Sequence, residues 1–302
     1  MPENGIYNSD LPNILHKGKV RDTYELDEEL LLMIVTDRIS AFDVVMHSPI
    51  PKKGEILAKM SEFWFKKTEG IIPNHFIGLA SNPEIFDLIS HFPVAKLLNE
   101  DLKKRAMVVK KAERINIECI VRGYITGSAW SEYSKRGTVN KIPINHKMME
   151  AEKFSEFIFT PSTKAEVGHD EPLSPEEGKQ LIGDDLYEQV KTKSIELYTF
   201  AHEYSKNKGM ILADTKFEFG FIDKKLSLID EALTPDSSRF WSIDEYSPGS
   251  SPLPYDKQFL RNWLSNQDWN KEPPPPEMPK NVITKTVEKY IDCLERVTDI
   301  KL

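Results

Sequence analysis

The clearest hydrophobic pattern in the first third of the chain is an unbroken apolar run at residues 30–35, which ends at a polar Thr-Asp pair. A run of this length predicts a buried central strand. Past Gly54, apolar side chains recur at helical spacing, at Ile56, Met60, Phe63 and Trp64. Two more strands are expected at residues 106–109 and 115–121. The first third therefore predicts strands followed by helices.

The middle of the chain, residues 126–175, is rich in Gly, Pro, Ser, Thr and charge, and it predicts little regular structure. The clearest helix follows, because Ser174, Pro175 and Glu177 stand at the N-cap, N1 and N3 positions. Its apolar stripe continues to a stop at Gly209, through Leu186, Val190, Leu197, Ala201 and Tyr204. A last helix is expected to carry Ile283, Val287, Tyr290, Leu294 and Val297 on one side.

A hairpin is predicted between these helices, from strands at residues 210–221 and 226–231. In the first strand Asp214, Lys216 and Glu218 share one face, because strand side chains alternate. If the turn is the three residues 223–225, Glu218 lies directly opposite Asp230, with Cβ atoms about 5 Å apart.

Two carboxylates at that distance repel each other unless one is protonated or a divalent cation lies between them. The hairpin therefore predicts an Mg²⁺ site at Glu218 and Asp230, with phosphate oxygens and water as the remaining ligands. Lys216, on the same face, could neutralise a phosphate or a substrate carboxylate. The alternative is a set of solvent-exposed charges on an amphipathic hairpin.

Two further segments could bind phosphate. Arg122 and Ser128 offer a guanidinium fork and a hydroxyl, and Arg239 follows two serines. The alternatives are a surface ion pair between Glu118 and Arg122, and a surface charge at Arg239.

The N-terminal region adds two weaker signals. Lys19 and Arg21 follow Gly18, whose turn would let the backbone approach phosphates; a solvated basic turn is the alternative. The polar loop at residues 36–43 either binds a small polar substrate or caps a helix.

Composition excludes several classes of protein. The chain has 302 residues and a net charge of −8, which disfavours a general binder of nucleic acid or of anionic membranes. Its longest apolar run is too short to span a bilayer. The polar N-terminus does not resemble a signal peptide, and Cys119 and Cys293 are expected to be buried, reduced thiols in a cytosolic protein.

Five segments together resemble the SAICAR synthetase (phosphoribosylaminoimidazole-succinocarboxamide synthase) family of purine biosynthesis. They are residues 18–22, 37–43, 117–122 with 126–128, 214–220, and 230–231 with 235–239. The length and residues 255–260 resemble the longer, yeast-like branch of the family.

The resemblance implies an ATP-dependent ligase that joins L-aspartate to the carboxylate of carboxyaminoimidazole ribonucleotide (CAIR). The products are SAICAR, ADP and phosphate, and an acyl phosphate is the expected activated species. The implied fold is α+β, with a β-rich nucleotide-binding subdomain at residues 1–112 related to ATP-grasp and kinase-like folds. Residues 113–302 would form a larger α/β subdomain with C-terminal helices that binds the substrates and Mg²⁺. A cytoplasmic enzyme is expected, with a monomer favoured over a homo-oligomer.

The resemblance also implies roles for individual residues. ATP would contact Lys19, Arg21 and Glu118, and Mg²⁺ would be held by Glu218 and Asp230. Catalytic roles fall to Asp214 and Lys216. CAIR and aspartate would be bound by Ser40, Asp43, Arg122, Ser128, Lys164, His169, Asp170 and Arg239. Where the family often has a second lysine near the glycine turn, this chain has Arg21, which keeps the charge.

Two rival functions fit parts of the sequence. A small-molecule kinase would also use Mg-ATP and acidic ligands, but the sequence contains no catalytic loop of the H-R-D type. The proline run at residues 273–276 could instead be a ligand for an SH3- or WW-type domain. A spacer that packs the last helix is the favoured interpretation of that run.

Overall fold

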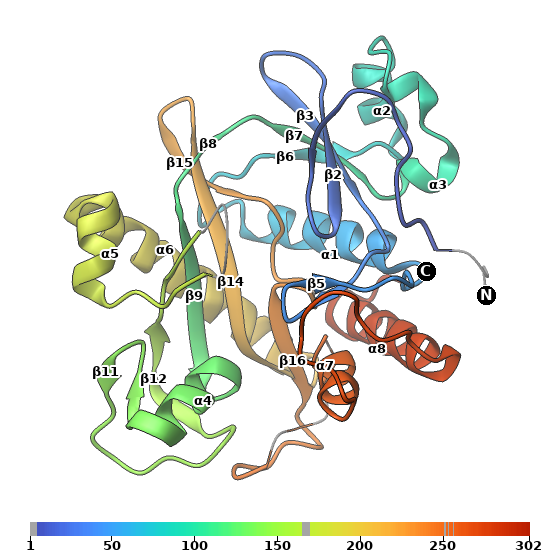
Figure 1. Ribbon diagram of the computed structural model, residues 1–302. Coiled ribbons are helices and arrows are strands. Elements are labelled where there is room, and N and C mark those ends of the chain that lie inside the picture. Colours follow the sequence, from blue (N-terminus) through green and yellow to red (C-terminus); the bar gives the residue numbers. More distant parts are fainter. Residues whose placement is uncertain (1–4, 165–169, 251, 253, 256) are drawn as a thin grey trace.

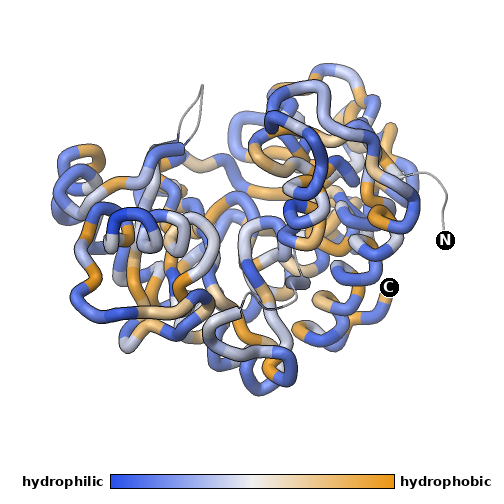
Figure 2. Tube along the Cα trace, turned by 60° about the horizontal axis from the view of Figure 1, so that its bottom comes forward, coloured by the Kyte–Doolittle hydropathy of each residue, from blue (hydrophilic) through white to orange (hydrophobic). Residues whose placement is uncertain are grey.

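The computed structural model describes residues 5–164, 170–250, 252, 254–255 and 257–302. Two antiparallel sheets dominate it (Figure 1), one built from the N-terminal third and one from the rest of the chain. Hydrophobic segments gather inside the molecule, whereas the peripheral loops are mostly hydrophilic (Figure 2). The arrangement is a mixed α and β fold, as predicted.

The N-terminal sheet has the strand order β1-β2-β3-β7-β6. Its strands are β1 (Ile14–Lys17), β2 (Arg21–Glu25), β3 (Leu30–Val35), β6 (Phe76–Leu79) and β7 (Ala106–Lys110). The predicted central strand is confirmed as β3, which pairs with β2 and β7. Its alternate side chains face two cores: Leu32 and Ile34 pack in a smaller cluster, and Met33 and Val35 in the main one.

Small elements surround this sheet (Figure 1). Helices α2 (Pro83–Ile89) and α3 (Glu100–Lys103) lie beside it, with a 3₁₀ turn, η1 (Ala95–Leu97), between them. The strands β4 (Ser40–Ala41) and β5 (Val44–Val45) form a short hairpin after β3.

The second sheet is built around the long strand β14 (Met210–Ile222). Its main path is β12-β9-β14-β15, formed by β12 (Lys153–Phe159), β9 (Ile117–Tyr124), β14 and β15 (Lys225–Ile229). Three short strands join the path: β8 (Glu113–Arg114) and β16 (Ser238–Ser242) pair with β14, and β13 (Ser162–Thr163) pairs with β9.

Four helices build the main core against these sheets. Helix α6 (Asp184–Asn207) packs on β14 and β9, and α8 (Lys280–Thr298) packs on α1 (Lys53–Thr68) and α7 (Gln258–Ser265). Most of the predicted apolar positions are buried, including Ile56, Met60 and Trp64 of α1 and Tyr290, Leu294 and Val297 of α8; a few, such as Phe63 and Ile283, are only partly buried. This core also contains residues of both sheets, so it spans the predicted division at residues 112 and 113. That division, and the relation to ATP-grasp and kinase-like folds, stay predictions.

The prediction of little regular structure at residues 126–175 is wrong. This stretch contains α4 (Gly127–Arg136), β10 (Thr138–Val139), β11 (Ile142–Pro143), β12 and β13. Strand β12 alternates only irregularly between buried and exposed positions. Its pairing with β9 is interrupted by an irregularity, which explains why no strand periodicity was visible.

The prediction of a single helix after Ser174 is also wrong. The capping box is present, but α5 (Pro175–Ile182) ends at Gly183, and α6 starts at the next residue. Gly183 has a φ of +85°, a conformation that glycine adopts easily and that interrupts the helix.

Both cysteines are buried and neither forms a disulfide, as expected. Burial raises the pKa of the Cys119 thiol, which keeps it protonated and unreactive. No helix among the described residues is long and apolar enough to cross a membrane.

Candidate active site

A cleft of about 1140 Å³ lies between the two sheets. One wall comes from β1, β2, β3 and the turn before β2, and the other from β9, β14 and residues 229–239. Every predicted site residue that the structure describes lines this cleft: Lys19, Arg21, Ser40, Asp43, Glu118, Arg122, Ser128, Lys164, Asp170, Asp214, Lys216, Glu218, Asp230 and Arg239. The remaining predicted residue, His169, lies outside the described residues.

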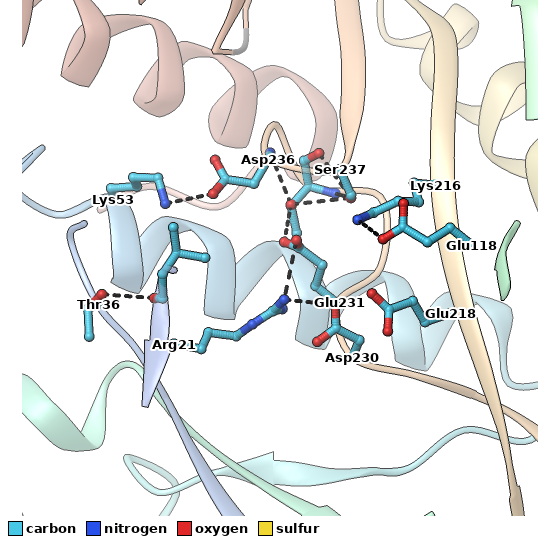
Figure 3. A network of polar contacts seen from close by, with 12 residues as sticks. Arg21, Thr36, Lys53, Glu118, Lys216, Glu218, Asp230, Glu231, Asp236 and Ser237 are labelled. Atoms are coloured by element: carbon cyan, nitrogen blue, oxygen red, sulfur yellow. Dashed lines mark hydrogen bonds and ion pairs between the residues drawn. The ribbon is translucent and has the colours of Figure 1, made fainter. Parts of the chain in front are cut away.

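Four charged side chains form a chain of ion pairs on the β9–β14 wall. The Glu118 carboxylate accepts from Lys216 at 2.7 Å and from Lys164 at 2.9 Å, and Lys164 also donates to Glu218 at 2.6 Å. Figure 3 shows Lys216 pointing to Glu118 and the Glu218 carboxylate turned toward Asp230. The expected alternative, a surface pair between Glu118 and Arg122, does not form, because both side chains are buried and have other partners.

The hairpin register differs from the predicted one. Its turn has two residues, Asp223 and Lys224, so Glu218 pairs with Ile229 and not with Asp230. Asp230 follows the end of β15 in a left-handed conformation, with a φ of +70°. Its charge nevertheless acts on Glu218, so the two carboxylates remain neighbours as predicted.

Arg21 reaches these acids from the opposite sheet. Its guanidinium donates to Asp230 at 2.7 Å and lies 3.7 Å from Glu231 (Figure 3). Arg21 and Asp230 are 209 residues apart in sequence, so this ion pair links the two walls of the cleft. Arg21 therefore holds Asp230 and Glu231 in place in this structure.

Burial and neighbouring charges give the two carboxylates opposite pKa shifts. Burial raises the pKa of Glu218, and the charge of Asp230 adds to the rise, outweighing Lys164 and Lys216. Burial would raise the pKa of Asp230 as well, but Arg21 and the two lysines lower it below its usual value. A cation between the two oxygens would relieve the repulsion that raises the pKa of Glu218.

Glu218 and Asp230 thus fit a hard cation that takes oxygen ligands. The described residues contain no group of three or more His, Cys, Asp or Glu side chains arranged for a metal ion. A cation at this pair would need other oxygen ligands, as Mg²⁺ does when phosphate and water complete its shell.

A second cluster centres on Asp214, in the middle of the large sheet. Arg122 of β9 lies opposite it on one side, and Arg239 of β16 lies opposite it on the other. Both guanidinium groups donate to the same Asp214 oxygen, Arg122 at 2.9 Å. Arg122 also donates to Thr160 at 2.9 Å and to Ser128 at 3.1 Å.

Gly127 makes room for this cluster. Its φ is +57°, and a Cβ there would lie 2.4 Å from a terminal nitrogen of Arg239. Only glycine is compatible with that approach. The Thr-Gly-Ser segment therefore brings the Ser128 hydroxyl and the N-terminus of α4 to the two arginines, an arrangement suited to an anion.

A buried arginine stabilises the glycine turn before β2 through hydrogen bonds to its backbone. Arg38 donates to the carbonyl oxygens of Gly18 and Lys19 at 3.0 and 3.1 Å, and to Asp22 at 2.6 Å. The loop at residues 36–43 therefore has a structural role, because its Arg38 stabilises the glycine turn. Lys19 itself is half-exposed and pairs with Asp43, which also lines the cleft, at 2.5 Å.

Several cleft residues were not predicted from the sequence. Apolar side chains line the part of the cleft near the N-terminal sheet: Leu15, Val20, Leu31, Met33 and Ile229. The unbroken apolar run of β3 gave no indication that Leu31 and Met33 face a cleft. Lys257 and Arg261, around the start of α7, also line it, and no motif identified them.

His75 is a buried cleft residue that makes the stability of the fold depend on pH. Burial lowers its pKa to about 4, and its Nε2 has no hydrogen-bond partner among the described residues. Because the unfolded chain would bind a proton near pH 6.5, the folded protein loses stability as the pH falls from 6.5 toward 4.

We expect His75 to cost about 2 kcal/mol of unfolding free energy at pH 5 relative to pH 7. Urea unfolding of wild type and His75→Gln at both pH values measures this cost. The variant should lose less stability on acidification than the wild type, whereas the exposed His146→Gln should behave like the wild type. Equal losses in all three proteins would contradict the assignment.

Comparison with known proteins decides the family. A family model described as SAICAR synthetase matches residues 14–276. The chain belongs to this family. Two curated relatives named phosphoribosylaminoimidazole-succinocarboxamide synthase, from Neisseria meningitidis serogroup C and Haemophilus influenzae strain PittEE, are each 50% identical over 286 residues. These matches cover 94% of this chain and 96% of each relative.

A solved structure agrees with this assignment. The SAICAR synthase of Saccharomyces cerevisiae, determined in complex with SAICAR, has a TM-score of 0.86 and 44% identity. The match covers 98% of this chain and 97% of the yeast chain. The resemblance to the SAICAR synthetase family and its yeast-like branch is thereby confirmed, and the chain is a member of a family of ATP-dependent ligases.

Proposed function

We propose that the cleft joins L-aspartate to the carboxylate of CAIR at the expense of ATP, giving SAICAR, ADP and phosphate. One observation supports the proposal: β14 brings Asp214, which holds two arginines, and Glu218, which neighbours Asp230, to the same wall of the cleft, with Lys216 between them. Four strand residues span roughly 13 Å. A phosphate-anchored substrate and a nucleotide can therefore meet near Lys216.

ATP would bind at the N-terminal side of the cleft. The apolar residues Leu31, Met33 and Ile229 offer a slot for a flat base, and Gly18 lets the backbone approach the phosphates. Lys19 would leave Asp43 for a phosphate, and Arg21 would act through its hold on Asp230. Glu118 would act indirectly, because it holds Lys216 and Lys164 in place.

Mg²⁺ would be held by Glu218 and Asp230, with phosphate oxygens and water as further ligands. When bound, it would neutralise charge that develops on the transferring phosphoryl group. Glu218 and Asp230 would contribute two buried carboxylates as metal ligands. A cation bound between them would relieve their mutual repulsion.

CAIR would bind with its phosphate against Arg122, Ser128 and Arg239. Those three side chains already converge on Asp214 or on one another, so little ordering is needed when the anion arrives. Aspartate would bind near the mouth of the cleft, where Ser40, Asp43, Lys164 and Asp170 line it.

The reaction would take two steps. A CAIR carboxylate oxygen attacks the γ-phosphorus of ATP, the bond to the bridging oxygen breaks, and ADP leaves. The aspartate amine then attacks the carbonyl carbon of the acyl phosphate, and phosphate departs as the amide forms and a proton is lost. Lys216 would neutralise the negative charge that builds up in both steps. Burial opposes its charge, but Glu118 and Glu218 raise its pKa, so it stays cationic.

We place this activity in the cytoplasm, where cysteines that form no disulfide stay reduced, and we propose a monomer as the active unit.

The rival function is transfer of the phosphoryl group to a hydroxyl, as in a kinase. Measuring ADP release with each substrate omitted in turn separates the two functions. The ligase should release ADP at full rate only when CAIR and aspartate are both present. Turnover with a hydroxyl acceptor and none with aspartate would refute it.

A further inference from the structure

A buried cluster of charges lies behind the anion site, at Asp236 in the loop between β15 and β16. The Asp236 carboxylate lies 2.7 Å from the Lys53 ammonium and 3.2 Å from the Lys257 ammonium. Its other oxygen accepts from the Tyr290 hydroxyl at 2.7 Å. The Lys53, Asp236 and Tyr290 side chains are at most 1% exposed, so these contacts are shielded from water.

Two of the three partners lie in helices, and the third directly precedes a helix. Lys53 is the first residue of α1, Lys257 directly precedes α7, and Tyr290 lies in the middle of α8. Figure 3 shows Lys53 pointing to Asp236, with Ser237 next along the loop. Asp236 therefore ties one loop of the cleft to the helical layer behind it.

That loop carries groups that face the cleft. The Ser237 carbonyl accepts the Lys216 backbone N–H at 3.0 Å, and Pro235, Ser237 and Arg239 line the cleft. A displacement of Asp236 would therefore move Arg239 relative to Arg122 and Asp214. ATP would bind on the opposite wall, which the ion pairs of Arg21 with Asp230 and Glu231 join to the start of this loop.

We propose that Tyr290, together with Lys53, positions the CAIR phosphate site by fixing Asp236 and, through it, the loop that carries Arg239. Neither residue touches a substrate, so both act as positioning residues. The C-terminal helix is thereby part of the substrate site, although it lies outside the cleft lining. This inference rests on the proposed function, because it assigns the Arg239 end of the cleft to CAIR.

The test uses Tyr290→Phe in the full-length chain, because the variant removes one hydroxyl and keeps the buried ring. A hydrogen bond to a charged acceptor contributes enough free energy to predict about a tenfold rise in the Michaelis constant for CAIR. The kcat and the Michaelis constant for ATP should change less than twofold. The matched control is Tyr187→Phe, a tyrosine of α6 that is 2% exposed and does not contact Asp236; it should leave all three constants unchanged.

A double-mutant cycle adds a readout that a structural role would not move. In an Asp236→Asn background, Tyr290→Phe should raise the CAIR constant less than twofold, because the charged acceptor is gone. Fully multiplicative effects would overturn the proposal, and so would equal changes in the CAIR and ATP constants of Tyr290→Phe. If Tyr290→Phe melts at a lower temperature than the wild type, both proteins are assayed at a temperature where both are folded. The ratio of the Michaelis constants for CAIR and ATP then tests the proposal. If the wild type forms no SAICAR, the proposed function fails; an active wild type with an unchanged variant refutes only this inference.

Discussion

Replacing Glu218 by glutamine is expected to lower kcat/KM about 100-fold or more while the protein stays folded. Glutamine keeps the shape of the side chain but removes the charge that would help to hold Mg²⁺. It also removes the repulsion between Glu218 and Asp230, which offsets the lost ion pair with Lys164. The change should therefore affect activity far more than stability.

Steady-state kinetics over a range of Mg²⁺ concentrations, together with thermal melting, measure this result. The Mg²⁺ concentration for half-maximal rate should rise in Glu218→Gln. The control is Glu156→Gln, an exposed carboxylate on β12 that should leave both the rate and the Mg²⁺ dependence unchanged. Wild-type turnover with an unaltered Mg²⁺ requirement in Glu218→Gln would refute the metal role.

Replacing Asp214 by asparagine is expected to cost about 3 kcal/mol of unfolding free energy and to raise the Michaelis constant for CAIR more than tenfold. Asp214 is the acidic partner that Arg122 and Arg239 share, and its side chain is buried. Without its charge, two guanidinium groups face each other with no anion between them. Repulsion then displaces the more exposed one, Arg239, from the position that would bind phosphate.

Chemical unfolding with and without inorganic phosphate measures this effect. Phosphate should stabilise Asp214→Asn less than it stabilises the wild type, because the displaced Arg239 no longer binds the anion together with Arg122. Asp292→Asn, which breaks the exposed pair with Arg296, should cost less than about 1 kcal/mol and be stabilised by phosphate as much as the wild type is. An Asp214→Asn protein as stable as the wild type would contradict the role of Asp214.

The sequence predicted the strand faces well and the hairpin register incorrectly. Alternation along β14 brings Asp214, Lys216 and Glu218 to one wall of the cleft, as expected. The turn residues Asp223 and Lys224 both take positive φ angles, of 49° and 63°. Two-residue turns of that kind are most readily recognised from Asn-Gly or Asp-Gly, so this sequence gave little sign of one.

The long-range ion pairs could not be predicted, because nothing local specifies a partner far along the chain. The partner of Arg21 is Asp230, and the partner of Lys53 is Asp236. Both pairs arise only when the two sheets and the helical layer pack together. Similarly, the side chain of Arg38 donates hydrogen bonds to backbone oxygens of the glycine turn, so the loop at residues 36–43 has a structural role. The polar sequence of this loop could not show whether it stabilises the fold or binds a substrate.

We propose that ATP activates the CAIR carboxylate before aspartate attacks it. The most direct measurement is the fate of ¹⁸O in CAIR labelled in that carboxylate, followed by mass spectrometry of the phosphate released during SAICAR formation. The proposed reaction transfers one labelled oxygen to phosphate and releases ADP in equal amount. Unlabelled phosphate alongside SAICAR would contradict the account, because the carboxylate oxygen would then never have bonded to phosphorus.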